Sequence, residues 1–165
     1  YIIMVLLVWT HLMKHEKINN RHFNHGRNPM FLTLMKTLHL GIIGGALYLL
    51  IELIWRGHTH WTMGLLGGTC FTLFGLLTLL RIPLYMKALL GTIIVTFLEL
   101  GAGLILNIWL KLAIWDYSAL PFNLYGQICA PYALLWLPLS IAGILLYPRL
   151  HTWLFQENYS HLRIN

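Results

Sequence analysis

The sequence predicts an all-α integral membrane protein, a bundle of four core transmembrane helices that form two helical hairpins. Composition is the first reason. Of the 165 residues, 58% are hydrophobic and only 10% are charged, whereas a soluble domain carries about 25% charged residues. The second reason is that several apolar runs approach the ~20 residues that a helix needs to cross a bilayer. One compact bundle suits a chain of this length.

The first 36 residues are expected to lie outside this bundle. Residues 1–13 begin with YIIMVLLVW, which lacks the basic start and the small-residue cleavage site of a signal peptide. As a helix they would be ~20 Å long at 1.5 Å per residue, short of the ~30 Å hydrocarbon core. We interpret them as a short or truncated first span. Residues 14–36 are polar and basic.

Four apolar runs follow, and each predicts one core helix. The loop RIPLYMK at 81–87 separates the two hairpins, because Pro83 interrupts a helix and a cation stands on either side of it. The final segment is mixed in character and is expected to be a cytoplasmic tail, with an interfacial helix as one form it could take. The bundle spans 37–147, with runs at about 37–55, 62–80, 88–110 and 124–147, and the tail spans 148–165.

The positions of lysine and arginine predict the orientation. Five lie in 14–36, two in 81–87 and two in the tail, nine in all, whereas the loops 56–61 and 110–123 hold one each. Cytoplasmic loops carry the excess of lysine and arginine, so these two loops are expected to be extracytoplasmic. Anionic lipid beside the spans also explains the net charge of +6. The expected partner is therefore the lipid bilayer, and not nucleic acid.

The two hairpins share a weak internal repeat. Each has a glutamate late in its first helix, Glu52 or Glu99, followed by a loop that contains tryptophan. Each then has a Gly-x-x-Cys sequence, at 67–70 and 126–129, and an apolar return helix. Because both hairpins run in the same direction, a true repeat would be parallel, related by an axis along the membrane normal. Chance similarity between leucine-rich hairpins is the alternative.

The two glutamates are the first candidates for a functional site. An ionisable side chain at the centre of a span costs at least ~2.5 kcal/mol on insertion scales, so it usually faces the interior of the bundle. Arg56 follows Glu52 by four residues on the same helix face, which leaves a purely structural ion pair as the alternative. The helix of Glu99 offers no such cation, and a hydroxyl or amide partner is the structural alternative there.

The second candidate region is IWDYSALPFNLYGQICAPYALLW at 114–136, where polar residues and prolines gather. Pro121 disfavours helix before it, and Pro131 would remove a helical hydrogen bond. Irregular backbone at membrane depth is tolerated only inside protein or beside a water-filled cavity, so we expect a loop that dips back into the bundle. The alternative is a capped helix start, with Asn123 as the N-cap and Gln127 tying down the loop.

These regions together predict a polar site near the outer leaflet, formed by residues that bind a ligand or satisfy the protein's own backbone. Two Gly-x-x-x-Gly sequences, at 41–45 and 64–68, predict close helix packing instead. The candidate site residues are Glu52, Arg56, Glu99, Asp116, Ser118, Asn123, Gln127 and Cys129.

No cofactor, metal site or catalytic residue is expected. The histidine pairs at 11 and 15, 22 and 25, and 58 and 60 lack a joining set of carboxylates or thiolates. The sequence contains no P-loop, no serine nucleophile elbow and no H-E-x-x-H motif. Two cysteines give no disulfide framework.

The stretch WDYSALPFNLYGQICAPYALLW, after a helix that carries a glutamate, resembles the CmpB-like family of putative ABC-transporter type IV permeases. LIELIWR, with Glu52 and Arg56, is similar to an earlier element of that family, and the resemblance covers about 40–155. It implies a small multi-pass protein of the bacterial cytoplasmic membrane. It implies no known substrate or cofactor. The matching residues of the stretch are Trp115, Asp116, Tyr117, Ser118, Leu120, Pro121, Phe122, Asn123, Gly126, Gln127, Ile128, Cys129 and Trp136.

Three functions fit these features. The first is a permease-like transport subunit whose polar site holds a cation, a proton or a polar solute, with ATP hydrolysis supplied by a separate ATPase. The second is a non-catalytic scaffold or accessory subunit of a larger membrane complex. The third is an intramembrane enzyme acting on lipid-linked substrates, with Glu99 or Asp116 as acid or base. No nucleophile supports the third, so we expect the first and no enzyme.

Overall fold

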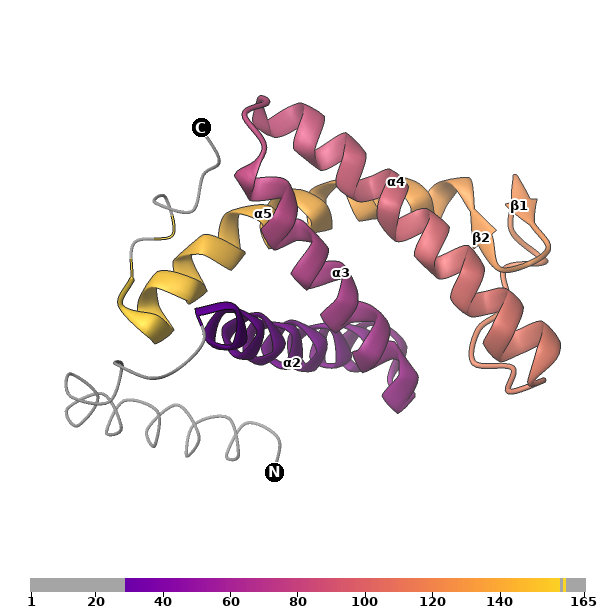
Figure 1. Cartoon of the computed structure of the whole chain (residues 1–165). Coiled ribbons are helices and arrows are strands. Elements are labelled where there is room, and N and C mark those ends of the chain that lie inside the picture. The colour runs from indigo at the N-terminus through magenta and orange to yellow at the C-terminus, as the bar shows by residue number, and fades with distance from the viewer. Residues whose placement is uncertain (1–28, 158, 160–165) are drawn as a thin grey trace.

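The computed structural model describes residues 29–157 and 159, and four long helices dominate this part of the chain (Figure 1). All four are long and apolar enough to cross a membrane, which confirms the predicted all-α membrane fold. The expected apolar helix at 1–13 and the basic residues 14–28 lie outside the described residues. The helices are α2 (Pro29–Arg56), α3 (Trp61–Leu79), α4 (Leu84–Gly103), which continues as the π-helix η1 (Leu104–Trp109), and α5 (Ala130–Phe155).

The last apolar run folds differently from the sequence prediction. A helix was expected from about residue 124, but two short antiparallel strands, β1 (Asn123–Leu124) and β2 (Ile128–Cys129), precede α5. Pro131 therefore lies in the first turn of α5, where its missing N–H costs no helical hydrogen bond. The helix also passes Pro148 and ends at Phe155, so the segment expected to be a tail begins as part of α5.

Glycines bring α2 and α3 into close contact. A Cβ added to Gly45 would lie 2.3 Å from the carbonyl oxygen of Gly64, and one added to Gly68 would lie 2.5 Å from the carbonyl oxygen of Gly41. Backbone thus fills the space that side chains would need. The prediction that both Gly-x-x-x-Gly sequences serve helix packing is confirmed.

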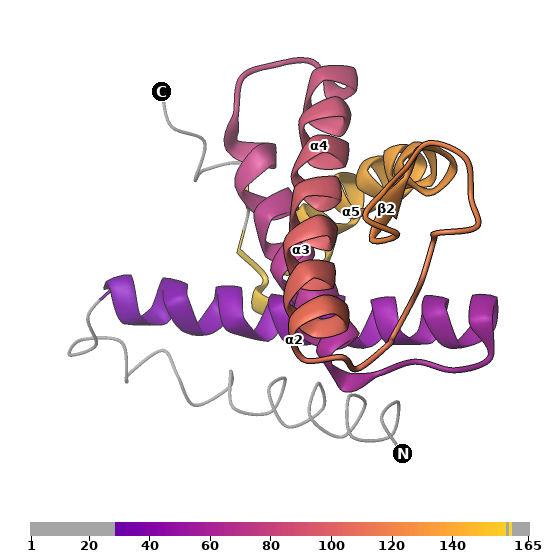
Figure 2. The same cartoon turned by 90° about the vertical axis from the view of Figure 1, so that its right-hand side faces the viewer.

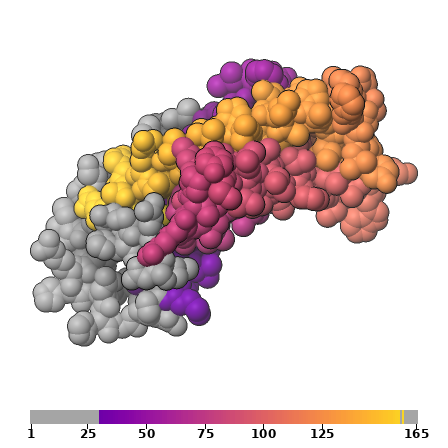
Figure 3. Space-filling model, turned by 90° about the horizontal axis from the view of Figure 1, so that it is seen from above, coloured from indigo at the N-terminus to yellow at the C-terminus, as the bar shows by residue number. Residues whose placement is uncertain are grey.

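Helix α3 contacts the other three long helices and supplies much of the core. Phe74 packs where Gly143 of α5 has no side chain, and Tyr147 of α5 packs in the same way against Gly75. In Figure 2, α3 and α4 run side by side, and α2 crosses the first half of α3. Figure 3 shows α5 (orange to yellow) lying alongside α4 (pink).

Long-range contacts define two ends of the bundle. At one end, Arg56 Nη2 donates a hydrogen bond of 2.7 Å to the carbonyl oxygen of Ile114, so the loops 57–60 and 110–129 meet there. We call this the hairpin end. At the other end, Lys36 pairs with Glu157. Sequential helices therefore alternate in direction and form the two expected hairpins, α2–α3 and α4–α5.

Candidate functional site

Glu52, near the end of α2, belongs to a complete ion-pair site. Its side chain is buried, with 5% exposure, and Oε1 accepts a 2.8 Å hydrogen bond from Arg56 Nη1. The Thr59 hydroxyl donates to Oε2. Because Arg56 also donates to the carbonyl oxygen of Ile114, the pair joins the ends of both hairpins. The i, i+4 spacing left a structural ion pair as the alternative for Glu52, and the structure shows this ion pair with Arg56.

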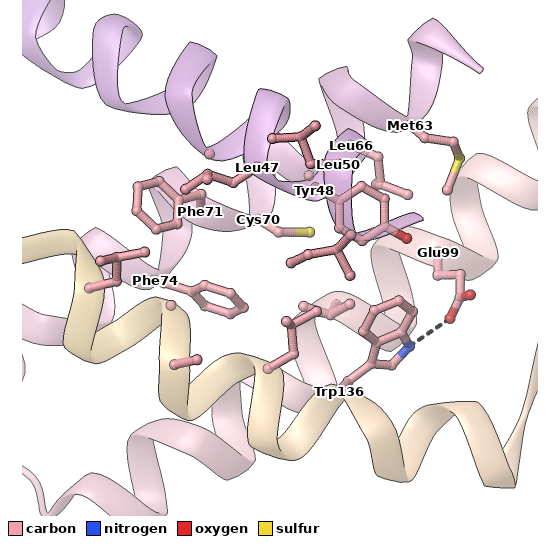
Figure 4. Close-up of a pocket in the computed structure, with 18 of the residues that line it drawn as sticks. Leu47, Tyr48, Leu50, Met63, Leu66, Cys70, Phe71, Phe74, Glu99 and Trp136 are labelled. Carbon is pink, nitrogen blue, oxygen red and sulfur yellow. Dashed lines mark hydrogen bonds between the residues drawn. The ribbon is translucent and has the colours of Figure 1, made fainter. Parts of the chain in front are cut away.

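Glu99, in the second half of α4, receives only neutral donors. Its side chain is 3% exposed. The Tyr117 hydroxyl donates to Oε1 at 3.1 Å. Trp136 Nε1 donates to Oε2 at 2.8 Å (Figure 4). No lysine, arginine or histidine among the described residues forms an ion pair with it. An ionised carboxylate offers about four acceptor sites, so these two donors leave acceptor capacity unused.

A cavity of about 270 Å³ lies against Glu99. All four long helices line it, and α2 and α5 form opposite sides of it in Figure 4. Its surface is almost entirely apolar, and Figure 4 shows the hydroxyl of Tyr48 pointing toward Glu99. The carboxylate is therefore the polar end of an otherwise hydrocarbon-like space.

Tyr117 approaches Glu99 from the loop that precedes β1. Burial, and then the charge of Glu99, raise the pKa of the Tyr117 hydroxyl, so it stays protonated and can donate. Its ring stacks on Tyr132 of α5, with 4.7 Å between ring centroids. The loop thus reaches Glu99 through an aromatic side chain.

Gln127 is buried in an amide network at the hairpin end. Its Oε1 accepts a 2.8 Å hydrogen bond from Asn107 Nδ2, which also donates to the carbonyl oxygen of Trp115. Asn107 Oδ1 accepts from the backbone N–H of Ile114, and Trp115 Nε1 donates to the carbonyl oxygen of Gln127. Sequence reasoning missed Asn107, which projects from the π-helix η1. A lone amide after Gly101-Ala-Gly103 in an apolar run was the available signal.

Three predicted site residues instead stabilise the exposed loop. Asp116 Oδ1 accepts from the backbone N–H of Ser118 at 2.8 Å, and this hydrogen bond lowers the pKa of Asp116. Asn123 Nδ2 donates to the carbonyl oxygens of Ser118 and Leu120, and its Oδ1 accepts from the backbone N–H of Gly126. The alternative of Asn123 as a helix N-cap was wrong, because Cys129 occupies that position in α5.

The backbone of this loop carries local strain. Four residues other than glycine have positive φ angles between 48° and 54°, a conformation that costs about 1–2 kcal/mol per residue. Such strain persists where the surrounding structure fixes the backbone, and the Asn107–Gln127 network lies beside it. The four residues are Lys111, Ala113, Phe122 and Tyr125.

The eight predicted site residues thus separate into distinct groups. Glu52 and Arg56 form an ion pair, Glu99 faces the cavity, and Gln127 belongs to the amide network. Cys129 is buried with a free thiol at the end of β2. Asp116, Ser118 and Asn123 are exposed. The predicted site residues did not include Tyr48, Tyr117 or Trp136, which lie next to Glu99, because their contacts depend on tertiary structure.

The described residues contain no group of three or more histidine, cysteine, aspartate or glutamate side chains that could hold a metal ion. The histidine pairs at 11 and 15 and at 22 and 25 lie outside those residues. His60 acts as the N-cap of α3, accepting from the backbone N–H of Thr62 at 3.4 Å.

A comparison with known protein families finds a match. The model of a family described as "Putative ABC-transporter type IV" matches residues 39–164. The match includes α3, α4, α5 and most of α2, and every residue that lines the cavity. No curated protein and no solved structure matches the chain.

Proposed function

The chain belongs to the family described as "Putative ABC-transporter type IV", and from this membership we propose that it is the permease-like membrane subunit of a transporter. It is a multi-pass membrane protein with four apolar helices. In this proposal Glu99 and the adjoining cavity form the substrate site. The role is one of binding and passage, and Glu99 is assigned no catalytic step.

One observation carries the proposal, namely a buried carboxylate in a span that lacks a cationic partner within the described structure. An unpaired charge inside a membrane protein is expensive, and such residues mark pathways for substrates, ions or protons. Glu52 serves as an internal contrast, because Arg56 already neutralises it. A polar end on an apolar cavity also has the general form of a ligand site.

The proposal requires an ATPase partner, because these 165 residues contain no P-loop. Gentle purification of the chain from its source membrane, followed by mass spectrometry, tests this requirement. We expect a nucleotide-binding ATPase in stoichiometric amount. Recovery with a multi-subunit assembly that contains no ATPase would contradict the transporter and favour the accessory-subunit role.

A specific observation favours that second role. Phe122 and Tyr125, at the tip of the hairpin end, are 88% and 72% exposed. Aromatic side chains at such a tip suit either a membrane interface or a partner subunit. Cross-linking from position 122 in the native membrane separates the two, because lipid adducts indicate an interface and a single protein adduct indicates a partner.

We also propose that the hairpin end is extracytoplasmic, in a bacterial cytoplasmic membrane. The excess of lysine and arginine at the opposite end supports this orientation. A Ser118→Cys variant, exposed in the loop, should react with a membrane-impermeant maleimide added to intact cells. Labelling only after cell lysis would reverse the orientation.

A further inference from the structure

We propose that the cavity beside Glu99 binds an amphiphile that has an apolar chain or ring and a positively charged amine at one end. This inference rests on the proposed transport function and names the class of its cargo. The geometry that carries it is a hydrocarbon-lined cavity with a single carboxylate at one end, in a part of the chain where that carboxylate has no cation.

The apolar part of the ligand follows from the lining. The cavity surface is almost entirely apolar, and its lining includes Leu47, Leu66, Phe74 and Leu139. The volume of about 270 Å³ is close to the lower end of small-molecule sites, about 300 Å³. That space suits one alkyl chain or a small ring system. A strongly hydrated solute would lose its water here without replacement hydrogen bonds.

The charge of the ligand follows from Glu99. Each of its two oxygens accepts one hydrogen bond, Oε1 from Tyr117 and Oε2 from Trp136. A protonated amine, which has donors and no acceptor, would use the remaining acceptor sites and neutralise the charge. An amphiphile with a carboxylate head would instead place two negative charges together in a medium of low dielectric constant.

Aromatic rings at the same end of the cavity favour a cation further. Tyr48 and Trp136 both line the cavity, with 6.3 Å between their ring centroids. The face of an aromatic ring attracts an ammonium group within about 6 Å of its centroid. The two rings and the carboxylate therefore offer one cation two kinds of attraction.

The position of the cavity indicates how such a ligand enters. Ile51 and Ile54, which belong to the lining, are exposed on α2. The cavity therefore reaches the surface of a helix that faces lipid. An amphiphile dissolved in the bilayer could enter from the side with its amine leading, without first crossing an aqueous vestibule.

Photo-cross-linking of the purified full chain in phosphatidylcholine nanodiscs tests the proposal. The probe is dodecylamine with a diazirine near the end of its chain, and matched diazirine derivatives of dodecanol and dodecanoic acid serve as controls. Peptide mass spectrometry then locates the adducts. We expect the amine to label cavity residues such as Leu47 and Leu139 about tenfold more than the alcohol, the ratio typical of one charge-assisted hydrogen bond, and the acid to label them least.

Two variants sharpen the test. Glu99→Gln keeps the shape and an acceptor for Trp136, and it should reduce amine labelling to the level of the alcohol while leaving alcohol labelling unchanged. Asp116→Asn removes an exposed carboxylate that does not line the cavity and should change neither. If the amine labels lipid-facing Ile93 and Phe97 as strongly as the cavity in the unaltered chain, simple partition into lipid explains the signal and the proposal fails.

The outcomes also separate this inference from the transport function. The cross-linking uses the chain without an ATPase. Equal labelling by amine and alcohol would therefore contradict an amine-bearing ligand, while transport of another substrate would remain supported. Selective amine labelling combined with no ATPase partner in the source membrane would support the amine-binding site and contradict the transport function. If the adducts formed on an apolar helix of a co-purified protein and not on the cavity residues, the cavity would be the binding site of a partner subunit. That result would overturn the proposal.

Discussion

Glu52 and Glu99 lie late in the first helix of their hairpins, and both are almost completely buried. Glu52 is held by the guanidinium of Arg56 and a threonine hydroxyl, all within the end of its own hairpin. Glu99 is held by a phenol and an indole and borders a cavity. Burial alone therefore does not identify a functional carboxylate. The decisive feature is whether the protein supplies the opposite charge.

The two hairpins also differ in how their helices pack and in how they are connected. Helices α2 and α3 meet through backbone at Gly45 and Gly64 and are joined by a short loop. Helices α4 and α5 are joined by a π-helix, a strained loop and two short strands. The first hairpin therefore supplies closely packed helices that line the cavity, and the second supplies Glu99 and both of its hydrogen-bond donors.

The largest effect is expected at Glu52. Glu52→Gln removes the anion and leaves the Arg56 guanidinium without its buried partner. Breaking a buried ion pair costs about 3–5 kcal/mol, and because the Arg56 side chain is 26% exposed, we expect the free energy of unfolding to fall by an amount near the lower end of that range. Thermal unfolding in detergent micelles measures the change. The double variant Glu52→Gln/Arg56→Gln should recover part of the loss, since neither charge remains. If Glu52→Gln left the free energy of unfolding unchanged, the ion pair with Arg56 would not distinguish Glu52 from Glu99.

The contrast between the hairpins is tested next at glycine. Gly45→Ala places a methyl group against the backbone of α3, and overpacking of this kind costs about 1–3 kcal/mol. Gly101→Ala, in α4, meets no atom within 4 Å and should be neutral or slightly stabilising. The same unfolding measurement compares them. Equal effects of the two substitutions would show that α2 and α3 are not in backbone contact.

Asn107 tests whether the second hairpin needs its amide network. Asn107→Ala leaves the Gln127 amide and two backbone groups without their partners, at a cost of about 1–3 kcal/mol. Because the network holds the loop that carries Tyr117, amine cross-linking at the cavity should also fall. Unchanged cross-linking in a folded Asn107→Ala protein would separate the network from the site.

Glu99→Gln should affect stability much less than Glu52→Gln, although the chemical change is identical. An unpaired buried carboxylate contributes little net stability, and its neutral isostere keeps an acceptor for Trp136. We expect a change below about 1 kcal/mol in either direction, together with loss of amine cross-linking. Destabilisation as large as that of Glu52→Gln would assign Glu99 a structural role.

The smallest effect is expected at Asp116, which is fully exposed. The hydrogen bond from the Ser118 backbone N–H lowers its pKa in the folded state. Any stability that Asp116 contributes is therefore present above its unfolded pKa of about 3.9 and is lost as the pH falls through the lower folded pKa. Asp116→Asn should unfold like the unaltered protein at pH 7. A clear loss of stability at that pH would mean that the loop depends on the charge.

Much of the fold could be predicted because its signals are local. Four long apolar runs gave the four helices, and the i, i+4 spacing gave the contact between Glu52 and Arg56. The glycine pattern gave the close packing of α2 and α3. Each of these features is encoded within one helix or one short segment.

The contacts of Glu99 at the cavity could not be predicted from such local signals. Glu99 meets Tyr117 and Trp136, which follow it by 18 and 37 residues, and no helical periodicity reports contacts of that range. The strands before α5 were missed because Leu124, Tyr125, Ile128 and Cys129 extend the apolar run of the helix toward the N-terminus. The loop was also treated as one polar site, whereas its exposed and buried residues have separate tasks.

A crystal structure of the purified chain grown with dodecylamine would locate the bound amine. We expect the amine nitrogen within about 4 Å of a Glu99 oxygen, the usual limit for an ion pair, with the alkyl chain in the cavity and the Glu52–Arg56 pair intact. An amine bound at Glu52 in place of Arg56, or a cavity without the alkyl chain, would contradict this expectation.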